Sequence, residues 1–275
     1  MKLATLLTRT AFGLALISGL GTMARADTLA DIKAAGKMVV VTEMQFPPFD
    51  FIENGEYTGF NKDLLDEVGK ELGVAMTYQD LPWTSILPGL EAKKFDFVAS
   101  PLNASRERLA RYAFSSPIAF SAPAFIKKKG NDGIKTNADM AGRTVGAIKA
   151  SAAVKALNAY SATLPAPITI REYSDAVQIY TDVANGRLEG GVSSLPNVSF
   201  AAAKRPEQLE ALVPAFGDPN YCGWVTRKDP EDASLMAAVN AALEKIKADG
   251  RMAQIQTKWF GRTEELPAVM PDPGF

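Results

Sequence analysis

The stretch "WTSILPGLEAKKFDFVASPLNASRERLARYAFSSP", residues 83–117, places a helix, a buried strand and a polar turn in direct succession. The segment "SILPGLEAKK" (85–94) predicts a helix with Ser85 as N-cap and Pro88 in the first turn, where a missing N–H is tolerated. The apolar segment "FDFVAS" (95–100) predicts a buried strand. Hydroxyl, amide and guanidinium groups gather where this strand ends: Ser100, Asn103, Ser105 and Arg108. Because ligands bind outside the carboxyl ends of parallel strands, this turn is a candidate binding site.

Strands and helices also alternate upstream of this stretch. The apolar run "KMVVVTE" (37–43) predicts a strand that is buried on both faces. A helix is predicted next, with Asn61 as its candidate N-cap and apolar residues at helical spacing behind it. The segment "MTYQDLPW" (76–83) predicts a strand and a turn. This β-α-β-α-β order indicates a parallel α/β sheet.

A second α/β series lies downstream. Strands are predicted at residues 143–148, 167–173 and 188–193, and the helices between them at residues 151–162 and 175–186. A further helix is predicted near the C-terminus, at residues 232–250, because its apolar residues share one face. Neither series contains a glycine-rich phosphate loop, so nucleotide binding has no support in the sequence.

The N-terminal 26 residues have the layout of a secretory signal peptide. Lys2 and Arg9 precede the apolar segment "AFGLALISGL" (11–20), and "ARA" (24–26) is a typical cleavage site. The apolar segment is shorter than the roughly 20 residues that a spanning helix needs. We therefore expect cleavage after Ala26, export to the periplasm and no membrane anchor.

The composition after residue 26 excludes several classes of function. The 27 basic and 31 acidic side chains leave no positive excess for nucleic acid or an anionic membrane. The chain has no histidine, which excludes histidine-dependent catalytic triads and zinc sites. Cys222 is the one cysteine, so no disulfide forms within the chain, and it lies far from the cleavage site where a lipid would be attached.

Three segments together resemble the periplasmic solute-binding proteins of polar amino acid ABC transporters, family 3. They are "MQFPPFDFIENGEYTGFNKDLLDEV" (44–68), the stretch 83–117 and "NGRLEGGVSS" (185–194), in the order and spacing of that family. The resemblance implies an α/β, two-lobed type II periplasmic-binding-protein (Venus flytrap) fold, with two hinge strands and a ligand cleft between the lobes. It implies that lobe 1 comprises residues 27–127 and 222–275 and lobe 2 residues 128–221.

The resemblance also implies roles for the polar turn. Arg108 matches the family arginine that holds the ligand carboxylate with two N–H bonds, a geometry that lysine cannot copy. Ser105 stands where the family has Thr or Ser, and Asn103 precedes it as a further ligand-binding candidate. Arg106 and Arg111 are expected to be solvated surface charges.

Two aromatic residues and one acid are further candidates. Phe46 and Trp83 match positions where the family surrounds the ligand with aromatic or apolar side chains, and the alternative is that both are ordinary core aromatics. Glu43 lies at the end of the first strand, where an acid can meet a ligand ammonium or a basic side chain. The alternative for Glu43 is a solvated carboxylate at a strand end.

The sequence departs from the family pattern in the second lobe. The family's usual Gly-Thr pair is replaced by Ala150 and Ser151, although Ser151 still offers a hydroxyl and an amide. Ser194 stands where the family has the aspartate that binds the α-ammonium, and Pro101 replaces a small residue. A buried ammonium without a counter-charge is costly. Either Glu43 supplies the charge, or the ligand lacks a free primary α-ammonium.

The implied function is capture of an amino acid or a similar small carboxylate, and its delivery to an ABC permease in the inner membrane. The protein would be a monomer without metal or organic cofactor, and it would not bind nucleic acid. Two alternatives on the same fold remain, namely a periplasmic dehydratase-like enzyme, with Glu43 as its acid-base group, and a ligand-sensing partner of a membrane receptor.

Overall fold

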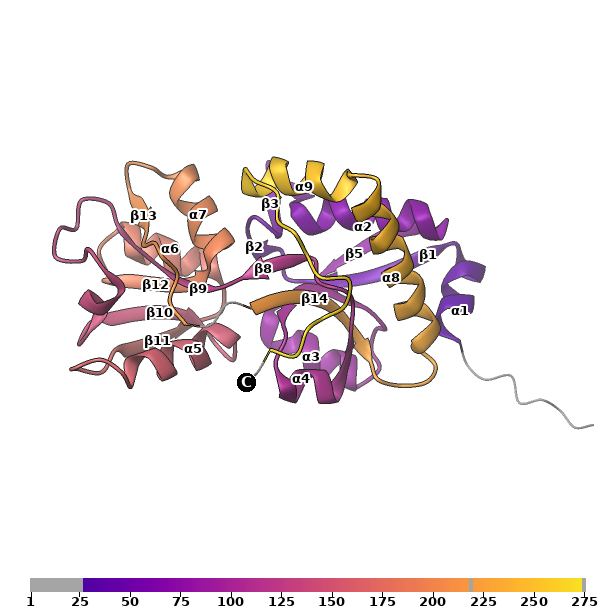
Figure 1. Cartoon of the computed structure of the whole chain (residues 1–275), viewed down its shortest axis with the longest axis horizontal. Helices are drawn as coiled ribbons and strands as arrows, with labels where there is room; N and C mark the ends of the chain where they lie inside the picture. The colour runs from indigo at the N-terminus through magenta and orange to yellow at the C-terminus, as the bar shows by residue number, and fades with distance from the viewer. Residues whose placement is uncertain (1–26, 218–219, 274–275) are drawn as a thin grey trace, which may run out of the picture.

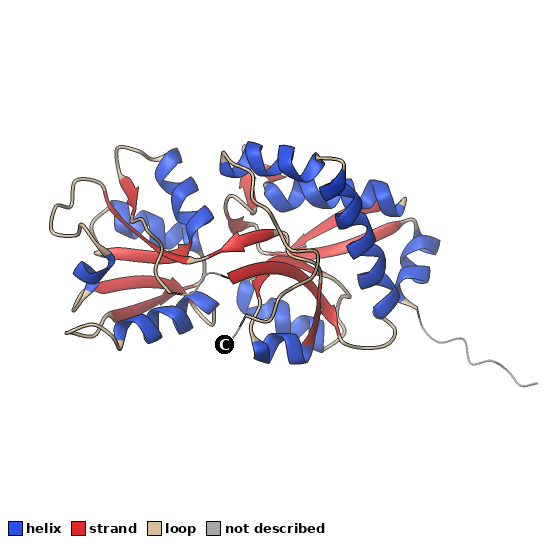
Figure 2. Ribbon diagram, viewed as in Figure 1, coloured by secondary structure: helices blue, strands red, loops and turns tan. Residues whose placement is uncertain are grey.

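The computed structural model describes residues 27–217 and 220–273, and it consists of two lobes, each built on its own β-sheet (Figures 1 and 2). We call the part built on the larger sheet the first lobe and the part built on the smaller sheet the second lobe. The expected signal peptide, residues 1–26, lies outside the described residues.

The first lobe contains a six-stranded sheet in the order β5-β1-β6-β14-β7, with β8 also paired to β14. Its strands are β1 (Lys37–Thr42), β5 (Ala75–Asp80), β6 (Val98–Asn103), β7 (Tyr112–Phe114), β8 (Ala119–Ser121) and β14 (Asn220–Arg227). β1 pairs in parallel with both β5 and β6, whereas β14 is antiparallel to its three partners. The predicted parallel α/β arrangement is therefore present, with an antiparallel strand that returns from the far end of the chain.

Helices cover both faces of this sheet (Figure 1). They are α1 (Thr28–Ala35), α2 (Phe60–Leu72), α3 (Trp83–Glu91), α4 (Arg106–Arg111), α8 (Ala233–Ala248) and α9 (Arg251–Phe260). Helices α2 and α8 place Leu64, Val68 and Val239 against Val40 and Trp224 of the sheet, all of them fully buried. This apolar core keeps the strand ends that face the second lobe in fixed positions.

The second lobe has a five-stranded sheet in the order β11-β10-β12-β9-β13. Its elements are β9 (Pro123–Lys128), the short 3₁₀ helix η1 (Asn137–Met140), β10 (Thr144–Ile148), α5 (Ala152–Ser161), β11 (Thr169–Tyr173), α6 (Ala176–Ala184), β12 (Gly190–Ser194), α7 (Leu195–Lys204) and β13 (Leu209–Ala211). β10 pairs in parallel with β11 and β12, while β9 is antiparallel to β12 and β13. The predicted second α/β series is thus a separate sheet.

The chain changes sheet twice. It leaves the first sheet after β8 and enters the second at β9, and it returns at β14 (Figure 1). A small third sheet of β2 (Gln45–Phe46), β3 (Asp50–Glu53) and β4 (Glu56–Thr58) lies in the first lobe. The lobe bounds, residues 27–127 with 222–275 and residues 128–221, remain a proposal.

Two local predictions were wrong, and each has a physical reason. Helix α3 begins at Trp83 rather than after Ser85, because Ser85 N–H already donates to Pro82 O at 2.8 Å, so Pro88 lies inside the helix. Asn61 does not cap α2, which begins after Gly59. Asn61 is instead fully buried, with Nδ2 donating to Asp50 Oδ2 at 2.5 Å and to Ala99 O at 2.8 Å.

The predicted strand at 95–100 is displaced along the chain, since β6 runs through Pro101 to Asn103. Pro101 has no N–H to donate. The ladder to β14 is irregular opposite this point, with a register shift between Gly223 and Val225, and this irregularity accommodates the proline.

Candidate functional site

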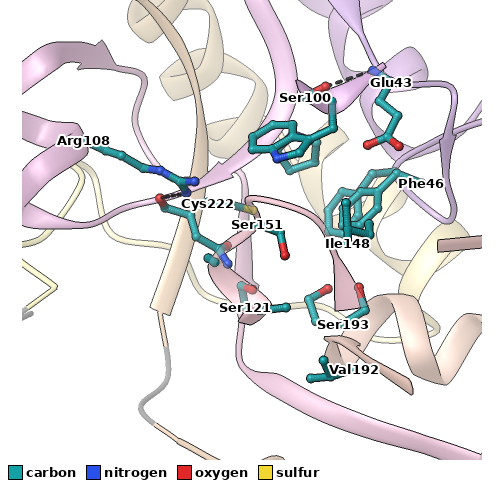
Figure 3. A pocket seen from close by; sticks show the side chains of 17 residues that line it. Glu43, Phe46, Ser100, Arg108, Ser121, Ile148, Ser151, Val192, Ser193 and Cys222 are labelled. Carbon is teal, nitrogen blue, oxygen red and sulfur yellow. Dashed lines mark hydrogen bonds between the residues drawn. The ribbon is translucent and has the colours of Figure 1, made fainter. Parts of the chain in front are cut away.

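A cleft between the two lobes contains most of the residues that the sequence singles out (Figure 3). Its empty volume is about 670 Å³ with the solvent at its mouth included. Seven of the eight predicted ligand-binding residues line it: Glu43, Phe46, Trp83, Asn103, Arg108, Ser151 and Ser194. Both lobes therefore contribute to the walls of the cleft.

Arg108 is held at one side of the cleft by the first lobe. Its Nη1 donates to the carbonyl oxygen of Asn103 at 3.0 Å, and its guanidinium carbon lies 5.9 Å from the centroid of the Trp83 ring. Burial lowers the pKa of Arg108, although Glu107 and Tyr112 act in the opposite direction. Within residues 27–217 and 220–273, no carboxylate forms a salt bridge with it. A desolvated guanidinium without an acidic partner is well suited to an incoming carboxylate.

Ser105 acts on Arg108 from the same turn. It is the N-cap of α4, and its Oγ accepts a hydrogen bond from Arg108 N at 3.2 Å. Ser105 is the one predicted ligand-binding residue that does not line this cleft, although it lines the compartment next to it. In this structure Ser105 stabilises the start of the helix that carries Arg108.

Phe46 and Trp83 form an aromatic wall. Both line the cleft and are partly exposed, unlike ordinary core aromatics. The Phe46 ring stacks on Phe49 with centroids 5.9 Å apart, and Trp83 is the first residue of α3. Both rings also pack against the apolar core of the second lobe. The wall therefore continues across the boundary between the lobes.

Glu43 follows β1 and is only 7% exposed. Its N–H donates to Ser100 Oγ at 2.9 Å, and its carboxylate points into the cleft beside Phe46 (Figure 3). Burial raises the pKa of Glu43 to about 8, and the negative charges of Asp175, Asp50 and Asp80 contribute to the rise. No basic side chain in the described parts of the chain forms a salt bridge with Glu43. The carboxyl group is thus mostly protonated near neutral pH, and a cationic group beside it would favour its charged form.

The acid and the guanidinium lie at separate ends of the cleft. Arg108 is not among the charges that shift the pKa of Glu43, nor is Glu43 among those that act on Arg108. Figure 3 shows the two side chains entering the cleft from opposite sides. The cleft can therefore hold an anionic group at one end and a cationic group at the other.

Ser151 contributes a hydroxyl from the second lobe. It occupies the N-cap position of α5, but its Oγ makes no capping bond and has no hydrogen-bond partner in the described residues, although it is buried. Ser151 and the first residues of α5 line the cleft. A helix N-terminus favours anions, so this hydroxyl and the amides behind it can complete a carboxylate site with Arg108.

The departure from the family's Gly-Thr pair has a structural cost at Ala150. This residue has φ 58°, in the left-handed region where a Cβ is unfavourable. We expect Ala150→Gly to raise the free energy of unfolding by about 1 kcal/mol, as measured by urea denaturation. The matched control is Ala152→Gly at the start of α5, which should lose roughly 0.5–1 kcal/mol. A loss of stability in both variants would contradict the strain at Ala150.

Ser194 takes part in a hydrogen-bond chain between the lobes. Its hydroxyl donates to Asn197 Oδ1, and Asn197 Nδ2 donates to Pro47 O of the first lobe at 2.6 Å. Glu43 is the one carboxylate among the described residues that line the cleft. The ammonium position that the family resemblance assigns to Ser194 is therefore lined by hydroxyls.

The sequence interpretation left out several residues that line the cleft, namely Phe49, Ser121, Ile148, Ala152, Ala153, Val192, Ser193 and Cys222. Ser121 and Cys222 line the cleft because β8 pairs with β14, a strand far along the chain. A local sequence pattern does not predict such pairing. Burial raises the pKa of the Cys222 thiol to about 12, so it is an unreactive part of the wall.

The described residues contain no group of three or more His, Cys, Asp or Glu side chains placed to hold a metal ion. In the same part of the chain, no helix has the length and apolar character needed to cross a bilayer.

Sequence comparison identifies relatives over nearly the whole chain. Residues 38–262 match the profile of the bacterial extracellular solute-binding proteins, family 3. The L-cystine-binding protein TcyJ of Escherichia coli (strain K12) is 31% identical over 271 residues, covering 95% of this chain and 98% of that protein. The arginine-binding periplasmic protein of Mannheimia haemolytica is 28% identical over 84% of this chain and 94% of its own length.

Structure comparison gives the same fold. A mutant of ArgBP from T. maritima has a TM-score of 0.76 and 27% identity, covering 85% of this chain and 99% of that one. The ancestral amino acid-binding protein AncCDT-1, described as a precursor of cyclohexadienyl dehydratase, has a TM-score of 0.75 and 29% identity, over 85% of this chain and all of that one. The fold is the predicted two-lobed type II periplasmic-binding-protein fold, and the chain belongs to the bacterial extracellular solute-binding proteins, family 3.

Proposed function

We propose that this protein is the receptor of an ABC importer and captures an amino-acid-like small carboxylate in the cleft between its lobes. The observation that carries the proposal is the half-buried Arg108 guanidinium, which has no acidic partner within the described residues and lies close to Asn103 and Trp83. A ligand carboxylate would supply the missing counter-charge. Relatives named for arginine and cystine binding support an amino acid or a derivative as the ligand.

Contacts across the cleft support capture by closure of the lobes. Lys155 Nζ of the second lobe lies 2.9 Å from Glu107 Oε2 of the first, and Lys204 Nζ lies 3.1 Å from Glu53 Oε1. These exposed pairs are individually weak. A ligand that contacts Arg108 and Ser151 at once adds interactions that exist only when the lobes are together, so binding shifts the population toward the closed form.

The ligand can be identified directly. We expect protein purified from the periplasm under native conditions to retain a small carboxylate that native mass spectrometry detects. Once its mass is known, the compound should raise the unfolding temperature of protein that was stripped by unfolding and refolding. A ligand at about 100 times its dissociation constant adds about 2.7 kcal/mol to stability. No retained compound, together with no thermal shift from a panel of amino acids and their derivatives, would contradict the proposed function.

Export and cleavage complete the proposal. We expect the mature protein to begin at Asp27, as a soluble periplasmic monomer, because "ARA" (24–26) ends the predicted signal peptide. N-terminal sequencing of the periplasmic protein tests this directly. A mature product that keeps the segment "AFGLALISGL" would show that the segment is retained as an anchor or a structural part.

A second candidate function is catalysis in the same cleft. Glu43, with its pKa raised to about 8, can hold and release a proton near neutral pH, as a general acid-base group must. AncCDT-1, named as the precursor of a dehydratase, shares the fold. Incubating the retained ligand with the protein and following it by NMR separates the two functions. Unchanged ligand supports a receptor, whereas turnover that Glu43→Gln abolishes supports an enzyme.

A further inference from the structure

The cleft continues into a second compartment along α5. Its empty volume is about 1590 Å³ with the solvent at its mouth included, more than twice the 670 Å³ of the first compartment on the same basis. The two share eight described lining residues: Asn103, Arg108, Ser121, Ser151, Ala152, Ala153, Ser193 and Ser194. The carboxylate site formed by Arg108 and Ser151 therefore lies at the border between two spaces rather than at a closed end.

Most of the exposed wall area of the second compartment is apolar, although uncharged polar side chains such as Ser105, Thr163 and Asn220 also line it. Its small and apolar lining residues include Ala152, Ala153, Ala156, Ala159 and Tyr160 of α5, together with Ala104 and Pro123 on the facing side. Apart from Arg108, its charged lining residues in the described chain are Glu107 and Lys155, which pair with each other at 2.9 Å. Away from Arg108, the compartment therefore offers a bound molecule mainly apolar contact and no unpaired charge.

Hydroxyl groups occupy the border where the α-nitrogen of a bound ligand must lie. In any α-amino acid that nitrogen is one carbon away from the carboxylate, so it stays next to Arg108 and Ser151. Besides Arg108 and Ser151, the polar residues that line both compartments are Asn103, Ser121, Ser193 and Ser194, none of which carries a negative charge. A charged ammonium would be buried there without a counter-charge, whereas an amide N–H would find a hydroxyl acceptor at no such cost.

We propose that the ligand is an Nα-acylated amino acid, whose acyl group lies in the compartment along α5. The carboxylate binds Arg108 and Ser151, the uncharged amide nitrogen lies beside Ser193 and Ser194, and the side chain extends toward Phe46 and Glu43. This inference rests on the proposed capture of a small carboxylate. It adds the chemical class of the ligand and assigns a use to the second compartment.

The test compares free amino acids with their acylated forms by calorimetry. L-arginine, L-glutamine and their Nα-acetyl and Nα-hexanoyl derivatives are titrated into stripped protein. We expect at least one hexanoyl derivative to bind ten times more tightly than its free amino acid. Ala156→Phe places a ring in the compartment and should reverse this preference, and Ala159→Phe tests the same space from a more exposed position. The matched control is Asn158→Phe, which adds the same ring to α5 at an exposed position outside the compartment.

The outcomes separate this inference from the proposed function. If a free amino acid binds as tightly as its acylated forms, or if Ala156→Phe and Ala159→Phe both fold and leave acyl-derivative affinity unchanged, the assignment of the second compartment is wrong while carboxylate capture stands. If neither free nor acylated compounds bind and native mass spectrometry finds no carboxylate, the proposed function itself fails. Tight binding of a hexanoyl derivative that only the two alanine replacements weaken supports the inference.

Discussion

Arg108→Lys is expected to weaken binding of the captured ligand by more than a factor of ten, or about 1.4 kcal/mol. Lysine keeps the positive charge but not the planar fork that bonds both carboxylate oxygens. It also lacks the guanidinium plane that Arg108 places 5.9 Å from the Trp83 ring centroid, and the Nη1 donor that bonds Asn103 O. Isothermal titration calorimetry with the compound identified by mass spectrometry measures the loss.

The matched control for this substitution is Arg111→Lys on the same helix. Arg111 is exposed and pairs with Glu91 at 2.6 Å, outside the cleft. An exposed pair of this kind contributes about 0–1 kcal/mol to stability and nothing to the ligand site. We therefore expect Arg111→Lys to bind as the wild type does. Equal affinities for wild type and Arg108→Lys, with unchanged circular dichroism, would remove Arg108 from the binding site.

The features that were predictable from sequence depend on short-range patterns. The β-α-β-α-β order follows from apolar runs such as 37–43 and from helical spacing, both of which are visible within roughly ten to twenty residues. The polar turn after β6 was found in the same way. The sequence places Asn103, Ser105 and Arg108 within six positions of one another, so these residues lie close together in space in any fold.

The features that were missed depend on neighbours distant in the chain. The sequence predicts Asn61 as an N-cap, but its side chain is buried and donates hydrogen bonds to Asp50 and to the carbonyl oxygen of Ala99. The environment of Glu43 includes Asp175, which is 132 positions away (175 − 43) and belongs to the other lobe. The second compartment exists only because α5 stands opposite the turn that carries Arg108. Hydrophobic periodicity does not reveal such long-range contacts, because they depend on how the two lobes pack against each other.

Glu43 should show opposite effects on stability and on affinity. In the ligand-free protein, burial and nearby acids raise its pKa from 4.5 to about 8. The folded state therefore binds more protons than the unfolded state between these pH values, and the stability due to Glu43 is present below about pH 4.5 and lost as pH rises through about 8. Glu43→Gln removes this loss. We expect the variant without ligand to be more stable than wild type at pH 8, by a few kcal/mol, and to approach wild type near pH 4.5.

Differential scanning calorimetry from about pH 4.5 to 9 measures this difference, a range that spans the ordinary and the raised pKa of Glu43. The pKa of Asp50 is also raised, to about 7, by burial, and it shifts stability in the same direction. Because Asp50 is present in both proteins, only the difference between them reports on Glu43. The control is Glu56→Gln, which changes an exposed acid on β4 and should follow the wild-type curve.

The same substitution should weaken binding of a ligand that carries a cationic group toward Glu43, by roughly 2–5 kcal/mol. The reason is that the glutamine amide offers no charge to a cation that is desolvated beside Phe46. Calorimetry at pH 8, where the wild-type carboxylate is more charged than at neutral pH, gives a large contrast. A variant that is more stable without ligand yet binds with unchanged affinity would mean that the ligand has no cationic group at this end. Glu43 would then be a buried acid that destabilises the empty cleft without contributing to recognition, and Arg108 would be the one charged contact in the described cleft that selects the ligand.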